Sequence, residues 1–542
     1  MRVLGLEGTA WCASAAVFET GTDAVLQESD AYVPDSGGIH PREAAEHVGD
    51  ALPTVVERVL GRLDELEARN EPGGRVEGPP VDAVAFSRGP GLGPCLRLVG
   101  TAARTLSGRW EVPLVGVNHM VAHLEIGRHR SGFDSPVCLN ASGANAHLLG
   151  YRDGRYRVLG ETMDTGVGNA IDKFTRHVGW SHPGGPKVEA AAEDGTYVDL
   201  PYVVKGMDFS FSGIMSAAKA AYDDGVPVED VCYSLQEHVF AMLTEVSERA
   251  LSLTGSDELV LGGGVGQNDR LREMLESMCD ARGAEFFAPE PRFLRDNAGM
   301  IAVLGAKMYE AGDCLEIPDS PVDPNFRPDQ VPVTWRSNDE TVATVDPETR
   351  LRGAEAVVEL AGDRVLKRRV EKSYRHPELD RTLRTTRTRR EARLTGDARR
   401  AGVPTPLVYD VDVPEATLTL QFVGEADLAE RLDADRCRRV GEHLARLHGA
   451  GFVHGDPTTR NVRVDDERTY LIDFGLGYYT DHVEDYAMDL HVFEGSVAGT
   501  APDAETLVES FEDGYREVGE ERVLDRLRTV EGRGRYQAAA GE

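Results

Sequence analysis

Residues 137–149 read VCLNASGANAHLL. Apolar residues on both sides of a small-residue turn predict a strand, a turn and a second strand. Residues 3–18 have the same layout, because an apolar strand runs into a Gly-x-x-Gly turn and Ser14 to Phe18 form a second strand. Such turns can present backbone N–H groups to a phosphate. The two hairpins predict a duplicated α/β fold with a nucleotide between its copies, although two unrelated turns would look the same.

Length and composition set limits on the class of protein. The 542 residues predict several compact units, and 41% hydrophobic residues are typical of a globular protein. We find neither an apolar run of about 18 residues nor a signal peptide. The seven cysteines are scattered, which argues against a disulfide framework. The sequence therefore predicts a cytoplasmic protein without a membrane partner.

The formal net charge is −33. It indicates either a surface that selects partners or, as we favour, adaptation to a very salty cytoplasm that screens self-repulsion. A nucleic-acid partner is not excluded, but its contacts must come from local arginine clusters or from a partner protein.

Two histidines, His119 and His123, open a helix that follows the strand at residues 112–117. Their i, i+4 spacing puts both imidazoles on one helix face, where they either grip a metal ion or form an ordinary polar face. Zinc peptidases have a glutamate after the first histidine as general base, and this chain has Met120 there. Peptide hydrolysis by that mechanism is therefore disfavoured.

Further polar and glycine-rich stretches recur along the first half. Their residues are suited to let a ribose or phosphate approach the backbone. They are Glu161–Phe174, His182–Glu189, Asp208–Gly213, Glu258–Asn268 and Asp296–Ala298.

In this order the motifs closely resemble the universal tRNA threonylcarbamoyltransferase family, the catalytic subunit of the KEOPS complex, over about residues 1 to 323. The shared patterns include Asn-His-x-x-x-His, Pro-Gly-Gly-Pro and Asp-Asn-Ala. The resemblance implies an actin/Hsp70-like fold, known as ASKHA. It also implies transfer of threonylcarbamoyl from threonylcarbamoyl-adenylate to N6 of the adenosine beside the anticodon of ANN-reading tRNAs.

The resemblance also implies roles for individual residues. A metal, iron or zinc, would be held by His119, His123 and Asp296. The adenylate would have its nucleoside bound by Asp172, Gly185, Glu189 and Asn268, with Ser142, Gly143 and Ala144 along its phosphate side.

Four positions depart from the family pattern. Asn140 stands where the family often has a tyrosine metal ligand, which puts a fourth protein ligand in question. Water or substrate can take that place instead. Ala144 replaces a usual glycine, and Ala146-His147 replaces a usual Thr-Gln pair.

The composition changes after the first half. Asp319 to Glu348 is rich in Pro, Asp and Thr and predicts an exposed linker. Two short strands follow, and then a basic helix from Arg381 to Arg400. The arginines of this helix form either a solvated face or a contact to RNA or phosphate.

The second half carries a phosphotransfer pattern, because Asp456, Asn461 and the Asp473-Phe474-Gly475 triplet follow one another with kinase spacing. In such sites the first aspartate orients or deprotonates the nucleophile, and the other two side chains hold magnesium. We expect Lys367 to contact the ATP phosphates and Glu391 to pair with that lysine.

Parts of an ordinary protein kinase are missing. Gly455 replaces the arginine that senses a phosphorylated activation loop, and Gly353 to Ala356 stand in place of a Gly-x-Gly-x-x-Gly loop. The half from about residue 350 to 536 resembles the Bud-type atypical kinase, another KEOPS subunit. This resemblance implies an ATPase that supports tRNA modification, with protein phosphorylation as a secondary activity.

Together these patterns predict an α/β ASKHA domain at residues 1–323, a linker at 324–348, and an α+β protein-kinase-like bilobal domain at 349–542. The expected ligands are one iron or zinc ion, the adenylate or ATP, and ATP with magnesium. The expected partners are tRNA and other KEOPS subunits, with a contact between the two domains. Two alternatives are a metallopeptidase fused to a signalling kinase, and a nucleotide-binding scaffold in which only the kinase is active.

Overall fold

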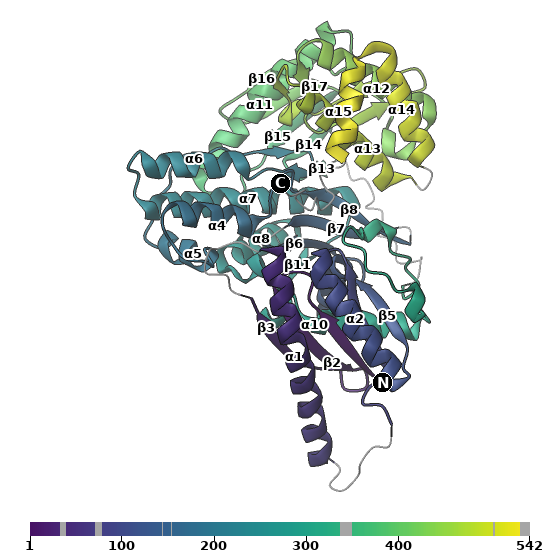
Figure 1. The fold of residues 1–542 in the computed structure, drawn as a ribbon. Helices are drawn as coiled ribbons and strands as arrows, with labels where there is room; N and C mark the ends of the chain where they lie inside the picture. The colour runs from purple at the N-terminus through teal and green to yellow at the C-terminus, as the bar shows by residue number, and fades with distance from the viewer. Residues whose placement is uncertain are drawn as a thin grey trace.

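The computed structural model describes residues 1–32, 40–70, 78–143, 145–152, 154–336, 350–501 and 504–531. The first half of the chain contains two five-stranded sheets, and the second half forms a separate domain above them (Figure 1). Within the described residues, no helix combines the length and the hydropathy that crossing a membrane requires.

The first sheet has the strand order β3-β2-β1-β4-β5. Strand β1 pairs antiparallel with β2 and parallel with β4, and β4 is parallel to β5. The bounds are β1 Arg2–Glu7, β2 Cys12–Glu19, β3 Ala24–Ala31, α1 Pro41–Asn70, β4 Ala83–Gly89, α2 Gly93–Trp110, β5 Leu114–Asn118 and α3 His119–Ser131.

The second sheet repeats this arrangement in the order β12-β11-β6-β7-β8. Its hairpin β6–β7 corresponds to β1–β2, and β11 lies parallel to β6 as β4 does to β1. The predicted duplicated α/β fold is therefore confirmed. The strands and the helices between them are β6 Val137–Ala141, β7 Ala146–Arg152, β8 Arg155–Glu161, α4 Val167–His177, α5 Gly185–Ala192, β9 Val204–Lys205, β10 Asp208–Phe209, α6 Ser212–Asp223, α7 Val228–Thr254, β11 Glu258–Gly262, α8 Asp269–Arg282, β12 Glu285–Phe287, α9 Pro291–Leu294 and α10 Ala298–Glu310.

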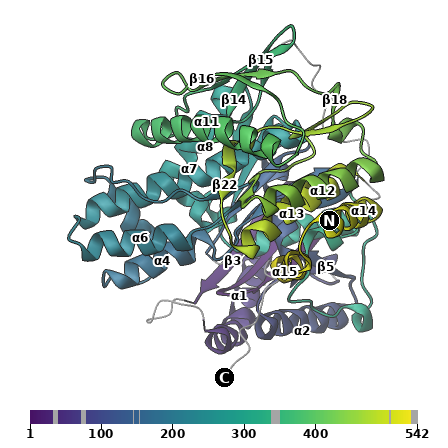
Figure 2. The ribbon, with the colours of Figure 1, turned by 90° about the horizontal axis from the view of Figure 1, so that it is seen from above.

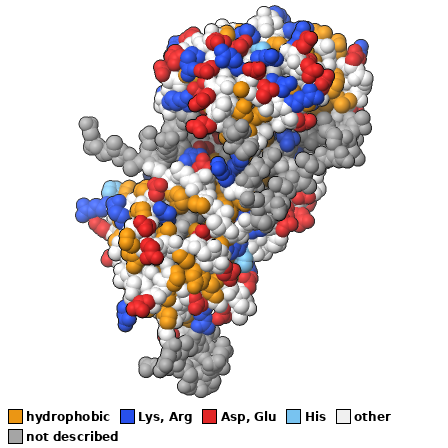
Figure 3. All heavy atoms as spheres, turned by 90° about the vertical axis from the view of Figure 1, so that its right-hand side faces the viewer, with side chains coloured by type: hydrophobic (Ala, Val, Ile, Leu, Met, Phe, Trp, Pro, Cys, Tyr) orange, Lys and Arg blue, Asp and Glu red, His pale blue; other side chains and the backbone are white. Residues whose placement is uncertain are grey.

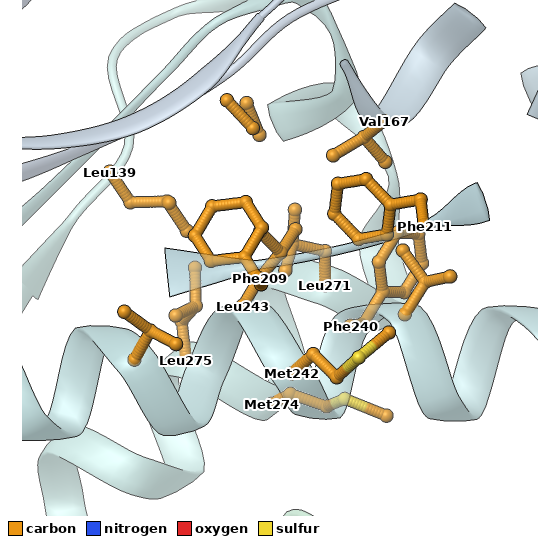
Figure 4. Close-up of a cluster of buried hydrophobic side chains, with 14 of the residues drawn as sticks. Leu139, Val167, Phe209, Phe211, Phe240, Met242, Leu243, Leu271, Met274 and Leu275 are labelled. Atoms are coloured by element: carbon orange, nitrogen blue, oxygen red, sulfur yellow. The ribbon is translucent and has the colours of Figure 1, made fainter. Parts of the chain in front are cut away.

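Helices α3 and α10 lie between the two sheets. Their apolar residues share one core with Val3 of the first sheet and with Cys138 and Val260 of the second. Strand β1 and helix α10 pack so closely that a Cβ on Gly5 of β1 would lie 2.4 Å from the Ala298 carbonyl oxygen. This close approach accounts for the small residues at the contact. A second core fills the other side of the second sheet, where Phe209, Phe211 and Phe240 meet (Figure 4).

The C-terminal domain has two lobes. A five-stranded sheet of order β13-β14-β15-β17-β16 packs with α11, and in the described residues four α-helices and two small sheets form the other lobe. The bounds are β13 Arg350–Arg352, β14 Ala356–Ala361, β15 Arg364–Arg369, α11 Pro377–Arg400, β16 Val408–Asp412, β17 Thr417–Gln421, β18 Ala426–Asp427, α12 Ala434–Gly449, β19 Phe452–Val453, β20 Val462–Val464, β21 Thr469–Leu471, β22 Tyr478–Tyr479, α13 Val483–Thr500, α14 Ala504–Val518 and α15 Glu521–Glu531.

The C-terminal domain lies on the second unit of the first half. Seen from above, α11 crosses over α7 and α8 (Figure 2). Acidic and basic side chains are interspersed over the outer face of this domain (Figure 3). The excess of negative charge is therefore not gathered into one acidic patch on that face.

The predicted exposure of the linker from Asp319 onward holds for only part of residues 320–336, because buried side chains are interspersed there with exposed ones. Ser320 is fully buried, Val331 packs into the core shared by the sheets, and Trp335 stacks on Tyr156 with ring centroids 6.3 Å apart. The segment is an irregular strap, so its apolar residues follow no helical or strand period that sequence reasoning detects. Residues 337–349 lie outside the described part of the chain.

Candidate functional site

Three predicted metal residues come together at the start of two helices. In the described part of the chain, one ligand atom each of His119, His123 and Asp296 lies within 4.8 Å of the other two. Asp296 Oδ1 is 3.3 Å from His119 Nε2 and 3.5 Å from His123 Nε2. Asn118 caps α3 and Asn297 caps α10 with their side-chain oxygens, so both helix starts have a defined geometry.

The chemistry of this group fits a metal ion. Two imidazoles and one carboxylate are ligands that zinc and iron accept. His123 is 1% exposed, and neither of its ring nitrogens has a hydrogen-bond partner in the described residues. Buried polar atoms without a partner are costly, so a cation between these side chains would satisfy them.

Glu7 is a functional residue that sequence reasoning missed. Its carboxylate is fully buried, and its Oε2 lies 3.1 Å from His119 Nδ1. Burial opposes a charge on His119, but Glu7 and Asp296 outweigh it and raise the pKa of His119 to about 10. A carboxylate on the second nitrogen orients a metal-bound histidine. The available signal was an acidic residue at the end of an otherwise apolar strand.

Asn140 lies on β6 and is 4% exposed, with no hydrogen-bond partner for its Oδ1 among the described residues. A Cβ on Gly262 would lie 3.8 Å from Asn140 Oδ1 and 3.5 Å from His123 Cβ. The amide therefore faces the same region as the metal residues.

The turn after β6 is held by backbone hydrogen bonds. Ser142 N donates to the Asn145 carbonyl at 2.9 Å, and Gly168 N donates to the Ser142 carbonyl at 3.3 Å. A Cβ on Gly168 would lie 2.7 Å from Gly143 Cα, so the start of α4 needs a glycine to approach this turn. Ala144 lies outside the described residues.

The four predicted nucleoside residues lie on α4, on α5 and at the start of α8. Asp172 accepts a hydrogen bond from Gly184 N at 2.8 Å, next to Gly185 at the start of α5. Glu189 accepts from Asp269 N at 2.9 Å, and this brings it beside Asn268. Asn268 caps α8, and its amide also donates to Gln236 Oε1 at 3.0 Å.

In the C-terminal domain the predicted ATP residues form one cluster. Lys367 Nζ lies 2.8 Å from Glu391 Oε1 and 2.7 Å from Asp473 Oδ1. Burial opposes the charge on Asp473, but Lys367 and Arg369 outweigh it and hold its pKa well below the ordinary value. Such a carboxylate stays ionised, as a magnesium ligand must.

The loop with Asp456 is fixed by buried hydrogen bonds. Asp489 accepts from the backbone N–H groups of His454 and Gly455 at 2.6 and 2.8 Å. Asn461 Nδ2 donates to the Asp456 carbonyl at 2.8 Å and to Asp456 Oδ2 at 3.1 Å. Burial raises the pKa of Asp456, and the nearby Arg249 opposes that shift. The predicted base and one predicted magnesium ligand are thus adjacent.

One face of α7 contacts both lobes of the C-terminal domain. The sequence did not reveal that residues of this helix take part in the domain contact. Arg249 Nη1 is 3.5 Å from Asp456 Oδ2, and Glu245 is 2.7 Å from Arg375 Nη2. Glu248 accepts a hydrogen bond from Lys372 Nζ at 2.5 Å. The expected contact between the domains therefore includes the loop of Asp456.

The basic helix α11 contributes to this contact. Arg387 is buried and lies 3.1 Å from Glu245 Oε1 and 2.7 Å from Glu355 Oε2. Arg384 Nε donates to Asp380 Oδ2 at 2.6 Å. These two arginines pair with carboxylates of the protein itself. For them, neither the predicted solvated face nor the predicted contact to RNA or phosphate is correct.

Comparisons with known proteins agree with this division. The model of the tRNA N6-adenosine threonylcarbamoyltransferase family matches residues 23–303, and that of the phosphotransferase enzyme family matches residues 449–528. Three relatives are each named probable bifunctional tRNA threonylcarbamoyladenosine biosynthesis protein. The proteins of Natronomonas pharaonis and Haloquadratum walsbyi are 70% and 68% identical over 99% of this chain and 100% of their own length. That of Methanospirillum hungatei is 50% identical over 98% of this chain and 99% of its own. The chain therefore belongs to the family of bifunctional tRNA threonylcarbamoyladenosine biosynthesis proteins.

Proposed function

We propose that the first half of the chain transfers threonylcarbamoyl from threonylcarbamoyl-adenylate to N6 of the adenosine beside the anticodon of ANN-reading tRNAs. The observation that carries this proposal is the group of His119, His123 and Asp296, which lies between two duplicated sheets in a chain of this family. In this proposal Asp172, Gly185, Glu189 and Asn268 bind the nucleoside. Ser142, Gly143 and Ala144 face the phosphate.

His119, His123 and Asp296 would hold an iron or zinc ion, and Glu7 would fix the ring of His119. When bound, such an ion acts as a Lewis acid on a carbamoyl or phosphate oxygen. The N6 amine is a poor nucleophile, so the residues that orient the adenylate contribute by placing the two reactants in line.

The second half would bind ATP with magnesium and hydrolyse it in support of the transfer. Lys367, held by Glu391, would contact the phosphates, and Asn461 and Asp473 would hold magnesium. Asp456 would orient or deprotonate the nucleophile. The contact of Arg249 with Asp456 supports a small nucleophile such as water in preference to a protein side chain, because α7 covers this side of the loop.

We further propose that the chain works in the cytoplasm with tRNA and with other KEOPS subunits. We also propose that its domains span residues 1–323, with the strap up to residue 336 packed on the first domain, and 349–542. The lobe with the β14–β17 sheet supports a subunit contact, because exposed apolar side chains lie on its strands and directly beside them. They are Leu360, Leu366, Leu407, Tyr409, Val411 and Phe422.

Reconstitution tests the proposal. The purified chain is incubated at high salt with the adenylate-generating enzyme, radiolabelled threonine, ATP, tRNA and the other KEOPS subunits. We expect label in tRNAs that read ANN codons, and none in a tRNA whose adenosine beside the anticodon is replaced. Equal labelling of both tRNAs would contradict the proposed acceptor.

A further inference from the structure

His147 is a buried histidine without an assigned role in either proposed site. It lies on β7 directly opposite Asn140 of β6, and residues paired across antiparallel strands project from the same face of a sheet. Their neighbours Leu139, Ala141, Ala146 and Leu148 project from the opposite face into the core under α7. Asn140 and His147 therefore point toward α3.

The cores on the two sides of the sheet support this orientation. Cys138 and Leu149, which share the face of Asn140 and His147, pack in one core with Val121 and Ala122 of α3. These two residues of α3 lie between His119 and His123. The imidazole of His147 thus projects from the sheet on the side that carries the metal residues.

The hydrogen bonding of His147 is unusual for this protein. Within the described part of the chain, His123 and His147 are buried and neither has a partner for either ring nitrogen. The other four buried histidines have hydrogen-bond partners at both nitrogens; they are His238, His443, His448 and His454. Asn140 Oδ1 also has no partner among the described residues.

His123, Asn140 and His147 are adjacent buried side chains with unmet hydrogen bonds, and they point to a shared ligand because a buried polar group without a partner is costly. An amide oxygen accepts one hydrogen bond or more, and a neutral imidazole donates from one nitrogen and accepts at the other. The nitrogens of His147 are not part of the group whose atoms lie within 4.8 Å of one another. His147 would therefore lie beside the ion and would not be one of its three protein ligands.

We infer that His147 is a positioning residue of the metal site, and that with Asn140 it hydrogen-bonds an oxygen ligand of the ion held by His119, His123 and Asp296. That oxygen belongs to water or to the carbamoyl or phosphate group of the substrate. The inference rests on the proposed metal site.

Metal binding by the full-length chain tests this inference without reference to activity. The apoprotein is titrated with Co²⁺ at high salt, and the visible absorption of the bound ion reports both affinity and coordination. We expect His147→Ala to raise the dissociation constant about 10- to 100-fold and to change the spectrum, as loss of a side chain beside a metal ligand does. His147→Gln should lose less, because an amide keeps a donor and an acceptor.

The pairing with Asn140 makes a second, independent prediction. If both side chains hold one oxygen, Asn140→Ala combined with His147→Ala should weaken Co²⁺ binding no more than the stronger single substitution does. Additive losses would contradict a shared ligand. Thermal unfolding of each apoprotein shows whether it is folded, and His147→Gln carries the test if His147→Ala is not.

Two controls separate this inference from the metal site on which it rests. His443→Ala removes a buried histidine of the C-terminal domain and should leave Co²⁺ binding unchanged. His123→Ala should abolish it. If His123→Ala abolishes binding while His147→Ala and His147→Gln leave affinity and spectrum unchanged, the role of His147 is wrong and the metal site stands. If His123→Ala also binds Co²⁺ normally, both are wrong.

Discussion

Arg249 of α7 and Asp456 of the kinase-like domain form an ion pair across the domain contact, with Arg249 Nη1 3.5 Å from Asp456 Oδ2. The side chain of Arg249 is almost fully buried, and its Nη2 also donates to Glu245 at 2.9 Å. The first half of the chain therefore supplies a charge to the proposed catalytic aspartate of the second half.

Arg249→Ala should move the acidic limb of the pH profile of ATP hydrolysis to higher pH. Burial raises the pKa of Asp456, and the positive charge of Arg249 opposes that shift. Without Arg249 the pKa of Asp456 is higher, so the carboxylate becomes ionised only at higher pH. Steady-state ATP hydrolysis across pH measures the limb.

Lys205→Ala is the matched control, because it removes another ion pair of the domain contact, that of Lys205 Nζ with Asp485 Oδ1 at 2.6 Å, which does not include Asp456. If both variants keep the limb of the unsubstituted protein, Arg249 does not act on Asp456.

Asp473→Ala should lower ATP hydrolysis by ~100-fold or more, because it removes a proposed magnesium ligand and the partner of Lys367. Binding of an adenylate analogue to the first half, followed by calorimetry, should be unchanged. Asp466→Ala serves as control, since that side chain is 91% exposed. Loss of both activities in Asp473→Ala would contradict two separate nucleotide sites.

Glu125→Gln should destabilise the first half by ~3 kcal/mol at neutral pH, because it leaves buried cations without their counter-charge. Glu125 is fully buried, with Lys307 Nζ at 2.9 Å and Arg336 Nη1 at 3.4 Å. Denaturant unfolding measures the loss. The exposed pair of Glu46 with Arg42 provides the control, and Glu46→Gln should change stability little.

The effect of Glu125 should depend on pH. Burial opposes its ionisation, but Lys307, Arg128 and Arg336 outweigh burial and lower the pKa from 4.5 to about 2. The stabilisation is thus complete above pH 4.5, the pKa of Glu125 in the unfolded chain, and is lost as pH falls toward the folded pKa of about 2. A constant difference between Glu125→Gln and the unsubstituted protein over this interval would contradict the assignment.

The sequence predicted the fold well where patterns are local or repeated. The hairpin at residues 137–149 and its N-terminal counterpart indicated the duplication that the two sheets confirm. The spacing of His119 and His123 put both on one face of α3, and the structure brings Asp296 to them from the segment just before α10. The partnership of Lys367 with Glu391 followed from the kinase pattern.

Residues whose role depends on distant packing were not predictable. Glu7 meets His119 only because β1 and α3 converge, and nothing near Glu7 in the sequence signals a histidine partner. Glu245, Glu248 and Arg249 have the spacing of a solvated helix face, yet the second domain covers them. The strap at 320–336 lacks a period, so its burial was visible only in three dimensions.

The central claim is that His119, His123 and Asp296 form the metal site of threonylcarbamoyl transfer. The most direct test measures transfer of labelled threonylcarbamoyl to tRNA, and metal content, for the unsubstituted chain and for Asp296→Ala in the same reconstituted mixture. We predict that Asp296→Ala folds and hydrolyses ATP normally but loses its metal and labels tRNA only at background. Full labelling of tRNA by Asp296→Ala would contradict the account.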